Sequence, residues 1–351
     1  MPAGAPTVVR EPASAAAAIA GEAVPSGWIR RPGEWDPVPP SEEPALIDAV
    51  GSRNRRLEMR AVREAWALAS PWMALSVLYA IRHPEVGLLV GLIAAAPAVM
   101  QTWDCLRSRR RWRMAPQQAA RRDGIRVRVA TWLGGRPGLG RWSVAVAVLV
   151  GIVTAATAFA GDAGRRVAMV DPAAIRAGAW WQLATGPLLH AGLFHVVFNL
   201  MAWFGLGDLL ARLLGRGVPV AVLGLGMVAG ACATTLWDGG RPSVGMSGGV
   251  SALFGLVAAA WWRWRAASPP GLARMAAINA LWMVAISVAG AGIVDHAAHA
   301  GGFAAGLLAG FLAVPPAPGP ILADRGWRIA TWIVFAGLVA AGAAAIALVW
   351  G

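Results

Sequence analysis

The chain has 351 residues, of which 57% are hydrophobic and only 14% are charged, and its mean hydropathy of +0.56 indicates a membrane protein rather than a soluble globular domain. It has no lysine, and its 31 arginines, against 18 acidic residues, gather at the ends of apolar segments. That placement is typical of membrane topology and excludes a nucleic-acid-binding surface. Cys105 and Cys232 fit no metal-binding spacing, so no metal or cofactor is expected.

The first 45 residues predict a disordered tail. They are rich in Pro, Ala, Gly and Glu and show no apolar periodicity, so they bury too little surface to offset the entropy of ordering. The tail also lacks the charged-then-apolar order of a signal peptide. We expect it to stay in the cytosol and to remain on the mature chain.

Residues 46–113 predict a charged helix followed by a helical hairpin. The charged helix covers about 46–64, and two short apolar stretches follow at 66–82 and 87–103. Because only four residues, Arg82–Glu85, separate the two stretches, they predict a tight hairpin of two short spans; a pair of interfacial helices is the alternative.

Residues 114–141 form a basic segment that we expect to be a cytosolic linker. Seven longer apolar stretches come after it, and a helix needs roughly 20 residues to cross the hydrocarbon core. They cover about 142–160, 186–210, 218–237, 246–262, 272–293, 297–314 and 328–350. These stretches predict an all-α polytopic membrane protein.

The arginines also predict the orientation of the chain, since short cytosolic loops accumulate basic residues. Arginines on both sides of the hairpin place its two ends inside. Counting alternate crossings from there puts the N-terminus in the cytosol and the C-terminus outside. Four arginines fall on the outer side against this trend: Arg165, Arg166, Arg176 and Arg241.

Three polar clusters interrupt the apolar spans, where such groups are costly and point to function. They are His190, His195 and Asn199; Ser247; and Asp295, His296 and His299. The orientation derived from the arginines brings all three clusters to the outer face of the membrane. A water-accessible site near that face would collect them.

The clusters contain the parts of a serine hydrolase. A serine hydroxyl needs a base to become a nucleophile, and Ser247 with His299 supplies that pair. His195 and Asn199 are four residues apart, so on a helix they share one face and can donate hydrogen bonds to an oxyanion. Glycines surround Ser247 and allow the backbone to approach a substrate closely; Gly245 and Gly248 are among them.

Simpler interpretations of these polar residues stay open at this point. The small residues around Ser247 also suit a close contact between helices, and His195 with Asn199 also suits a structural hydrogen-bonded pair. His296, three residues before His299, is the rival base. Asp295 is either a solvated helix start or a third member that orients His299.

Taken together, "LLHAGLFHVVFN", "GMSGG" and "AHAGG" resemble the motifs of the rhomboid intramembrane serine proteases, in the same order and each on its own span. The resemblance covers about residues 142–350. It implies a six-helix catalytic core at 142–314, and a linker with one additional C-terminal transmembrane helix at 315–351.

The same resemblance implies residue roles. Ser247 would be the nucleophile, His299 the general base, His195 and Asn199 the oxyanion donors, and His190 a residue of the active-site cavity. Spaced by four, the three glycines Gly302, Gly306 and Gly310 would let the His299 helix pack closely on the Ser247 helix.

Two positions depart from the family pattern. Gln182 stands where members often carry an arginine that anchors a membrane-embedded loop. Ser251 stands where an aromatic ring often stacks on the catalytic histidine.

We therefore expect a multi-pass protein of the plasma (inner) membrane that cleaves transmembrane helices of client proteins near the outer face through a Ser-His dyad. A catalytically silent relative that only binds such clients is the alternative. A transporter or channel is disfavoured, because the spans show no repeats and few charges. The oligomeric state stays open.

Overall fold

The computed structural model describes residues 16, 17, 19, 38–82, 84–237, 241–265, 294–316 and 324–351. These residues form helices, turns and isolated bridge positions, and no extended strand lies among them. Five of their helices are long and apolar enough to cross a membrane, which confirms an all-α polytopic fold. The predicted span 272–293 and most of the predicted tail lie outside the described residues.

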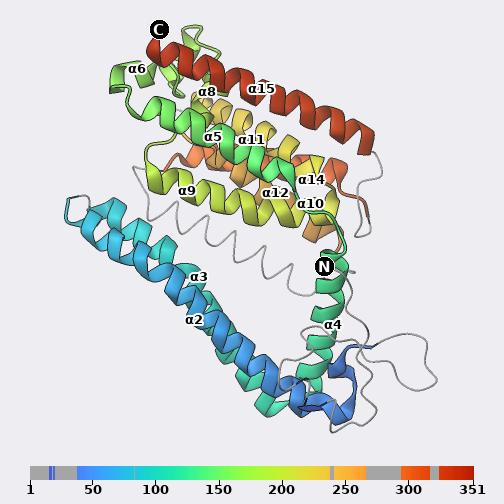
Figure 1. Cartoon of the computed structure of the whole chain (residues 1–351). Helices are drawn as coiled ribbons and strands as arrows, with labels where there is room; N and C mark the ends of the chain where they lie inside the picture. The colour runs from blue at the N-terminus through green and yellow to red at the C-terminus, as the bar shows by residue number, and fades with distance from the viewer. Residues whose placement is uncertain are drawn as a thin grey trace. The chain divides into compact units, whose positions relative to one another are not determined.

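The chain divides into two compact units, Met1–Trp132 and Leu133–Gly351. In the first unit, helices α2 (Ile47–Ala80) and α3 (Pro84–Met114) lie side by side as a hairpin (Figure 1). Trp66 Nε1 donates to Thr102 Oγ1 at 3.0 Å, which pairs the middle of α2 with the middle of α3. The charged helix expected at 46–64 is thus continuous with the first arm of the hairpin.

Residues 114–141, expected as a linker, contain helix α4 (Pro116–Gly134), most of which belongs to the first unit. Arg128 of α4 pairs with Glu42 at 2.9 Å, and Asn54 of α2 donates to Asp123 of α4 at 2.8 Å. Burial raises the pKa of the Asp123 carboxyl, although the Asn54 hydrogen bond opposes that shift. These polar contacts fasten α4 to the rest of its unit.

The second unit opens with α5 (Arg141–Ala158) and then a loop that contains short helices. The loop elements are α6 (Asp162–Arg166), α7 (Pro172–Arg176), α8 (Gln182–Thr185) and η3 (Gly186–Leu188). The elements after the loop are α9 (Leu193–Ala202), η4 (Trp203–Gly207), α10 (Asp208–Leu214), α11 (Gly217–Leu236), α12 (Ser247–Arg263), α14 (His296–Ala313) and α15 (Asp324–Trp350).

Elements α9, η4 and α10 form one continuous helix from Leu193 to Leu214, with a π-helical turn in the middle. The stretch predicted at 186–210 therefore starts later than expected, because Pro187 and the residues after it form a 3₁₀ turn and a loop. Helix α11 is the centre of the unit: 72% of its apolar window is buried, against 22–33% for the other four candidate spans. Helices α12, α14 and α15 pack around it.

Glycines bring helices α12 and α14 into backbone contact. A Cβ at Gly302 would collide with the Gly248 carbonyl, and one at Gly306 would collide with the Ala252 carbonyl. Gly302, Gly306 and Gly310 are all buried. This confirms the close packing that their spacing predicts, and it fixes α14 against the first turns of α12.

Replacing Gly306 with alanine should destabilise this interface. Overpacking a tight contact costs typically about 1–3 kcal/mol, and here the obstacle is backbone, which yields little. We expect a lower unfolding temperature for purified Gly306→Ala in detergent. Gly337→Ala on α15 is the matched control, because no heavy atom lies within 4 Å of the added Cβ there. Equal unfolding temperatures for Gly306→Ala and the wild type would contradict the packing argument.

Helices α12 and α14 run parallel. Near their C-terminal ends, Arg263 donates to the Phe311 carbonyl at 3.2 Å and Trp264 Nε1 donates to the Pro315 carbonyl at 2.7 Å. Since Gly248 and Gly302 meet near the other end, the N-termini of both helices lie together. Ser247 begins α12 and His299 lies in the first turn of α14, so both residues occur at this end.

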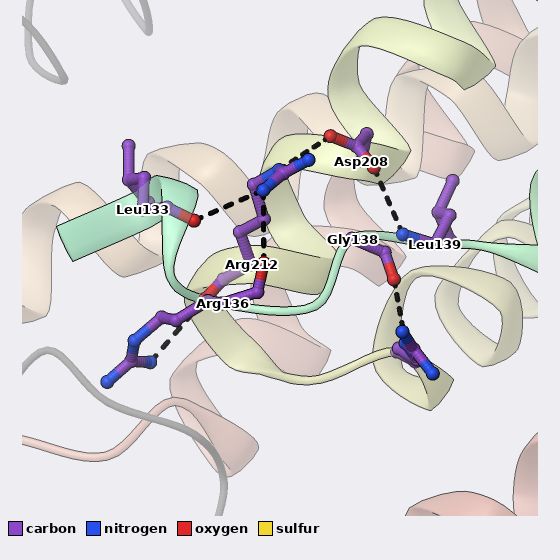
Figure 2. A network of polar contacts seen from close by, with 7 residues as sticks. Leu133, Arg136, Gly138, Leu139, Asp208 and Arg212 are labelled. Carbon is purple, nitrogen blue, oxygen red and sulfur yellow. Dashed lines mark hydrogen bonds and ion pairs between the residues drawn. The ribbon is translucent and has the colours of Figure 1, made fainter. Parts of the chain in front are cut away.

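Helix α10, the C-terminal part of the α9–α10 helix, carries a polar network (Figure 2). Arg212 pairs with Asp208 at 2.7 Å and donates to the carbonyls of Leu133 and Arg136 at 3.2 and 3.0 Å. Asp208 accepts from the Leu139 amide at 3.1 Å. The charge pair thereby fixes the segment that leads into α5.

Candidate active site

Ser247 is the first residue of α12, directly after a glycine with positive φ. Gly245 has φ +114°, which favours glycine, and a Cβ at this position would fall on the His195 imidazole. The turn before α12 therefore lies against the ring of His195. Ser247 itself is neither fully buried nor fully exposed. Helix N-termini leave their first backbone N–H groups without helical partners, so free donors surround Ser247.

Helix α9 positions His195 and Asn199 one turn apart, as predicted. The Asn199 amide donates to the His195 carbonyl at 2.9 Å, and Asn199 is buried, with 6% of its surface exposed. One of its two N–H groups is thus used within the helix. The second is the one available to another acceptor.

His190 lies beside His195, with the ring centroids 5.0 Å apart and the planes at 68°. Its Nδ1 is 3.3 Å from Thr154 Oγ1 of α5, and the Arg165 guanidinium donates to its carbonyl at 2.7 Å. Nε2 of His190 is buried without a hydrogen-bond partner among the described residues. Sequence reasoning missed Thr154 and Arg165, because neither stands in a recognisable motif.

Asp295 caps α14, and both of its carboxylate oxygens accept hydrogen bonds from groups other than His299. Its Oδ1 accepts from the Ala298 amide at 2.9 Å, and its Oδ2 accepts from Thr234 Oγ1 of α11 at 2.6 Å. Nδ1 of His299 is buried with no partner among the described residues. The carboxylate is therefore a helix cap, and no hydrogen bond joins it to the His299 ring among the described residues. Thr234, which ties the cap to α11, carried no sequence signal.

The Ser247 and His299 helices meet beside both residues. A Cβ at Gly248 would lie 3.4 Å from the Ala298 carbonyl, and Gly302 touches Gly248 from the same helix. No hydrogen bond joins Ser247 Oγ to His299 among the described residues; in free enzymes such bonds are often long. His296 is exposed, whereas His299 is half-buried.

Gln182 anchors the loop between α5 and α9 by hydrogen bonds. Gln182 is 2% exposed. Its Nε2 donates to the carbonyls of Arg166 and Val167 at 3.2 and 3.1 Å. Its Oε1 accepts from the Asp171 amide at 3.0 Å. An uncharged amide thus holds the loop at the position where an arginine was expected from the resemblance.

The anchored loop also holds the turn before Ser247. Val170 and Ser243 exchange two backbone hydrogen bonds of 3.0 and 2.8 Å, and the Gly245 amide lies 3.4 Å from the Gly186 carbonyl. A Cβ at Gly186 would collide with Val170, so this glycine is required. The Gly186–Pro187 pair was the available signal for this turn.

At Ser251, the second departure from the family pattern, the small side chain is 2% exposed and lies one turn after Ser247 on α12. It provides no ring to stack on His299. Within the described residues, no group of three or more histidine, cysteine or acidic side chains is placed to hold a metal ion.

One comparison with known proteins concerns this second unit directly. A family model described as the rhomboid domain matches residues 177–316. A protein named rhomboid protease GlpG from Pectobacterium atrosepticum is 34% identical over 137 residues, which cover 37% of this chain and 48% of that protein. The protein of the same name from Yersinia pestis is 31% identical over 136 residues, covering 37% and 47%. The chain thus matches about half the length of these relatives. The hairpin unit lies outside residues 177–316, which the family model matches.

Proposed function

Because residues 177–316 match the rhomboid domain model, we propose that the protein is an intramembrane serine endopeptidase of the rhomboid family. One observation carries the proposal: the turn before Ser247 lies on the His195 ring, while the first turn of its helix packs on the residues beside His299. Three motifs from separate helices thereby meet at one end of the core.

In the proposed reaction, His299 takes the proton of Ser247 as the oxygen attacks a peptide carbonyl. The carbonyl π bond breaks and a tetrahedral oxyanion forms. The imidazolium of His299 then gives its proton to the leaving amine, the C–N bond breaks, and an acyl-Ser247 remains. Water then attacks the acyl carbon while His299 takes its proton; the bond from that carbon to Ser247 Oγ breaks, and the imidazolium returns the proton to Ser247 as the new carboxyl end leaves.

Donors near Ser247 would stabilise the oxyanion. The backbone N–H groups in the first turn of α12 have no helical acceptor, and the helix dipole favours negative charge there. His195, seated against Gly245, and the remaining N–H of Asn199 are the side-chain donors. Such donors act on charge that develops only in the transition state, so each contributes to rate rather than to binding.

The proposed substrates are transmembrane helices of other proteins. A helix in lipid hides its carbonyls behind backbone hydrogen bonds, so it must unwind locally before Ser247 can attack. Substrates with small or helix-destabilising residues near the cut should therefore be preferred. We place the site at the outer face of the plasma membrane, with the N-terminus in the cytosol. Arg212 and Arg263 support this orientation, because they lie in the last turns of α10 and α12, at the ends away from the site.

The alternative, a silent binder of transmembrane clients, requires the same fold without chemistry. Loss of the serine or the histidine would favour it, but Ser247 and His299 are both present.

The proposal is tested by reconstituting the full chain in vesicles with a single-span model substrate. We expect one cut in or beside the membrane segment, located by mass spectrometry. A matched substrate with leucines in place of the small residues should be cut more slowly. Binding of both substrates without any cut would favour the silent binder and overturn the proposal.

A further inference from the structure

In the hairpin unit, one face of helix α3 combines arginines with large apolar side chains. It forms a groove of about 340 Å³ whose lining residues are Leu106, Arg109, Arg110, Arg113 and Met114. Counted from Leu106, the others follow at three, four, seven and eight residues, so they share one side of the helix. The groove lies outside the unit that carries the candidate active site.

The other side of α3 is the packed one. Cys105, Ser108 and Trp112 are buried, and the Trp112 ring lies against Gly51 of α2, where a Cβ would come within 2.9 Å of it. This contact fixes which side of α3 is turned away from α2. On that side Leu106 is 54% exposed and Met114 is 73% exposed. A ligand of the groove therefore gains by bringing apolar surface of its own.

The arginines of the groove are not neutralised by carboxylates. Among the described residues, Arg110 and Arg113 form no ion pair. The groove is therefore a site of concentrated positive charge beside exposed apolar side chains, and its ligand is an anion.

If the predicted span at 87–103 crosses the membrane, the groove falls at the headgroup level of the bilayer. An apolar stretch of α3 ends at Trp103, which is 54% exposed, and the Arg107 guanidinium lies 4.8 Å from the centre of its ring. Exposed tryptophans mark membrane interfaces, and arginine clusters directly after an apolar helix attract anionic lipids. The groove begins three residues after Trp103.

From these features we infer that the groove binds an anionic phospholipid. Arg109, Arg110 and Arg113 bind its phosphate oxygens, and Leu106, which lies between Trp103 and these arginines along α3, contacts the glycerol and the start of the acyl chains. Charge alone would suit any phosphate, but exposed Leu106 on the Trp103 side of the arginines favours a ligand that carries hydrocarbon next to its phosphate. The hairpin unit is thus a lipid-binding module attached to the rhomboid domain.

Native mass spectrometry of the full chain in non-ionic detergent tests this inference, with phosphatidylglycerol and phosphatidylcholine as probes. The groove variant is Arg109→Gln, Arg110→Gln, Arg113→Gln. The control, Arg63→Gln, Arg121→Gln, Arg122→Gln, removes equal charge from exposed arginines of the same unit. Only the groove variant should bind phosphatidylglycerol more weakly, by roughly 100-fold, and phosphatidylcholine binding should be equal in all three proteins.

Two results would overturn the inference: unchanged phosphatidylglycerol binding by the groove variant, or a loss of the same size in the control. Inorganic phosphate serves as the arm without acyl chains. Displacement of the lipid by phosphate at equal concentration would mean a simple anion site, and it would also contradict the inference. If the triple variant does not fold, Arg110→Gln alone and the comparison of the two lipids on the wild type decide the question.

Discussion

Replacing Ser247 with alanine should reduce cleavage of a transmembrane substrate by roughly 10⁴-fold or more, because no other group in the proposed reaction can form the acyl intermediate. The substitution removes one oxygen atom at the start of α12 and leaves the glycine contacts with α14 in place. Unfolding temperature and substrate binding should therefore stay close to wild type. The measurement is the initial rate of cleavage in vesicles at equal protein concentration.

Ser251→Ala is the control for this prediction. Ser251 lies one turn further along the same helix and is buried, so the same atom is removed from the same element. We expect a cleavage rate near that of the wild type. If Ser247→Ala retained the wild-type rate, another nucleophile would be acting and the proposed reaction would be wrong.

Replacing His299 with alanine should cause a loss of similar size, whereas His296→Ala should retain most activity. His299 flanks the contact between α14 and Gly248, while His296 is exposed. Residues that act as a unit are not additive, so Ser247→Ala combined with His299→Ala should be no slower than either single variant. Cleavage rates of the four proteins measure this directly.

If His296→Ala lost activity and His299→Ala retained it, the general base would be His296. The reaction would then not depend on the contact between α14 and Gly248. A double variant much slower than both single variants would also contradict the prediction. It would mean that Ser247 and His299 contribute independently.

Much of the second unit was predictable from local pattern. The apolar stretches predicted most of the described helices, because a span must be long and apolar whatever it packs against. The spacing of Gly302, Gly306 and Gly310 predicted the α12–α14 contact, since only small residues allow backbones to approach in lipid. Each of these signals lies within one helix.

Features that depend on two distant segments were not predictable. The contact between the His195 ring and Gly245 requires a positive φ at Gly245 and a histidine from another helix. The engagement of Asp295 by Thr234 likewise joins two helices, and from sequence alone Asp295 could have been a solvated residue or an orienting acid. Gln182 was noticed as a departure, but its three backbone partners appear only when the loop is folded.

In the hairpin unit, the α2–α3 turn followed from the four residues between two apolar stretches. Helix α4 was not predicted from the sequence, because the segment is basic and only weakly apolar. Its contacts with Glu42 and Asn54 come from residues more than 60 positions away. Whether the apolar parts of α2 and α3 cross the bilayer stays a prediction.

Labelling with a serine-reactive fluorophosphonate tests the central claim most directly, because such a probe reacts with a serine only when a neighbouring base removes its proton. The wild type should carry one label, mapped by mass spectrometry to Ser247. His299→Ala should lose the label, and His296→Ala should retain it. Absence of label from the folded wild type, or equal labelling of Ser247 after loss of His299, would contradict the account.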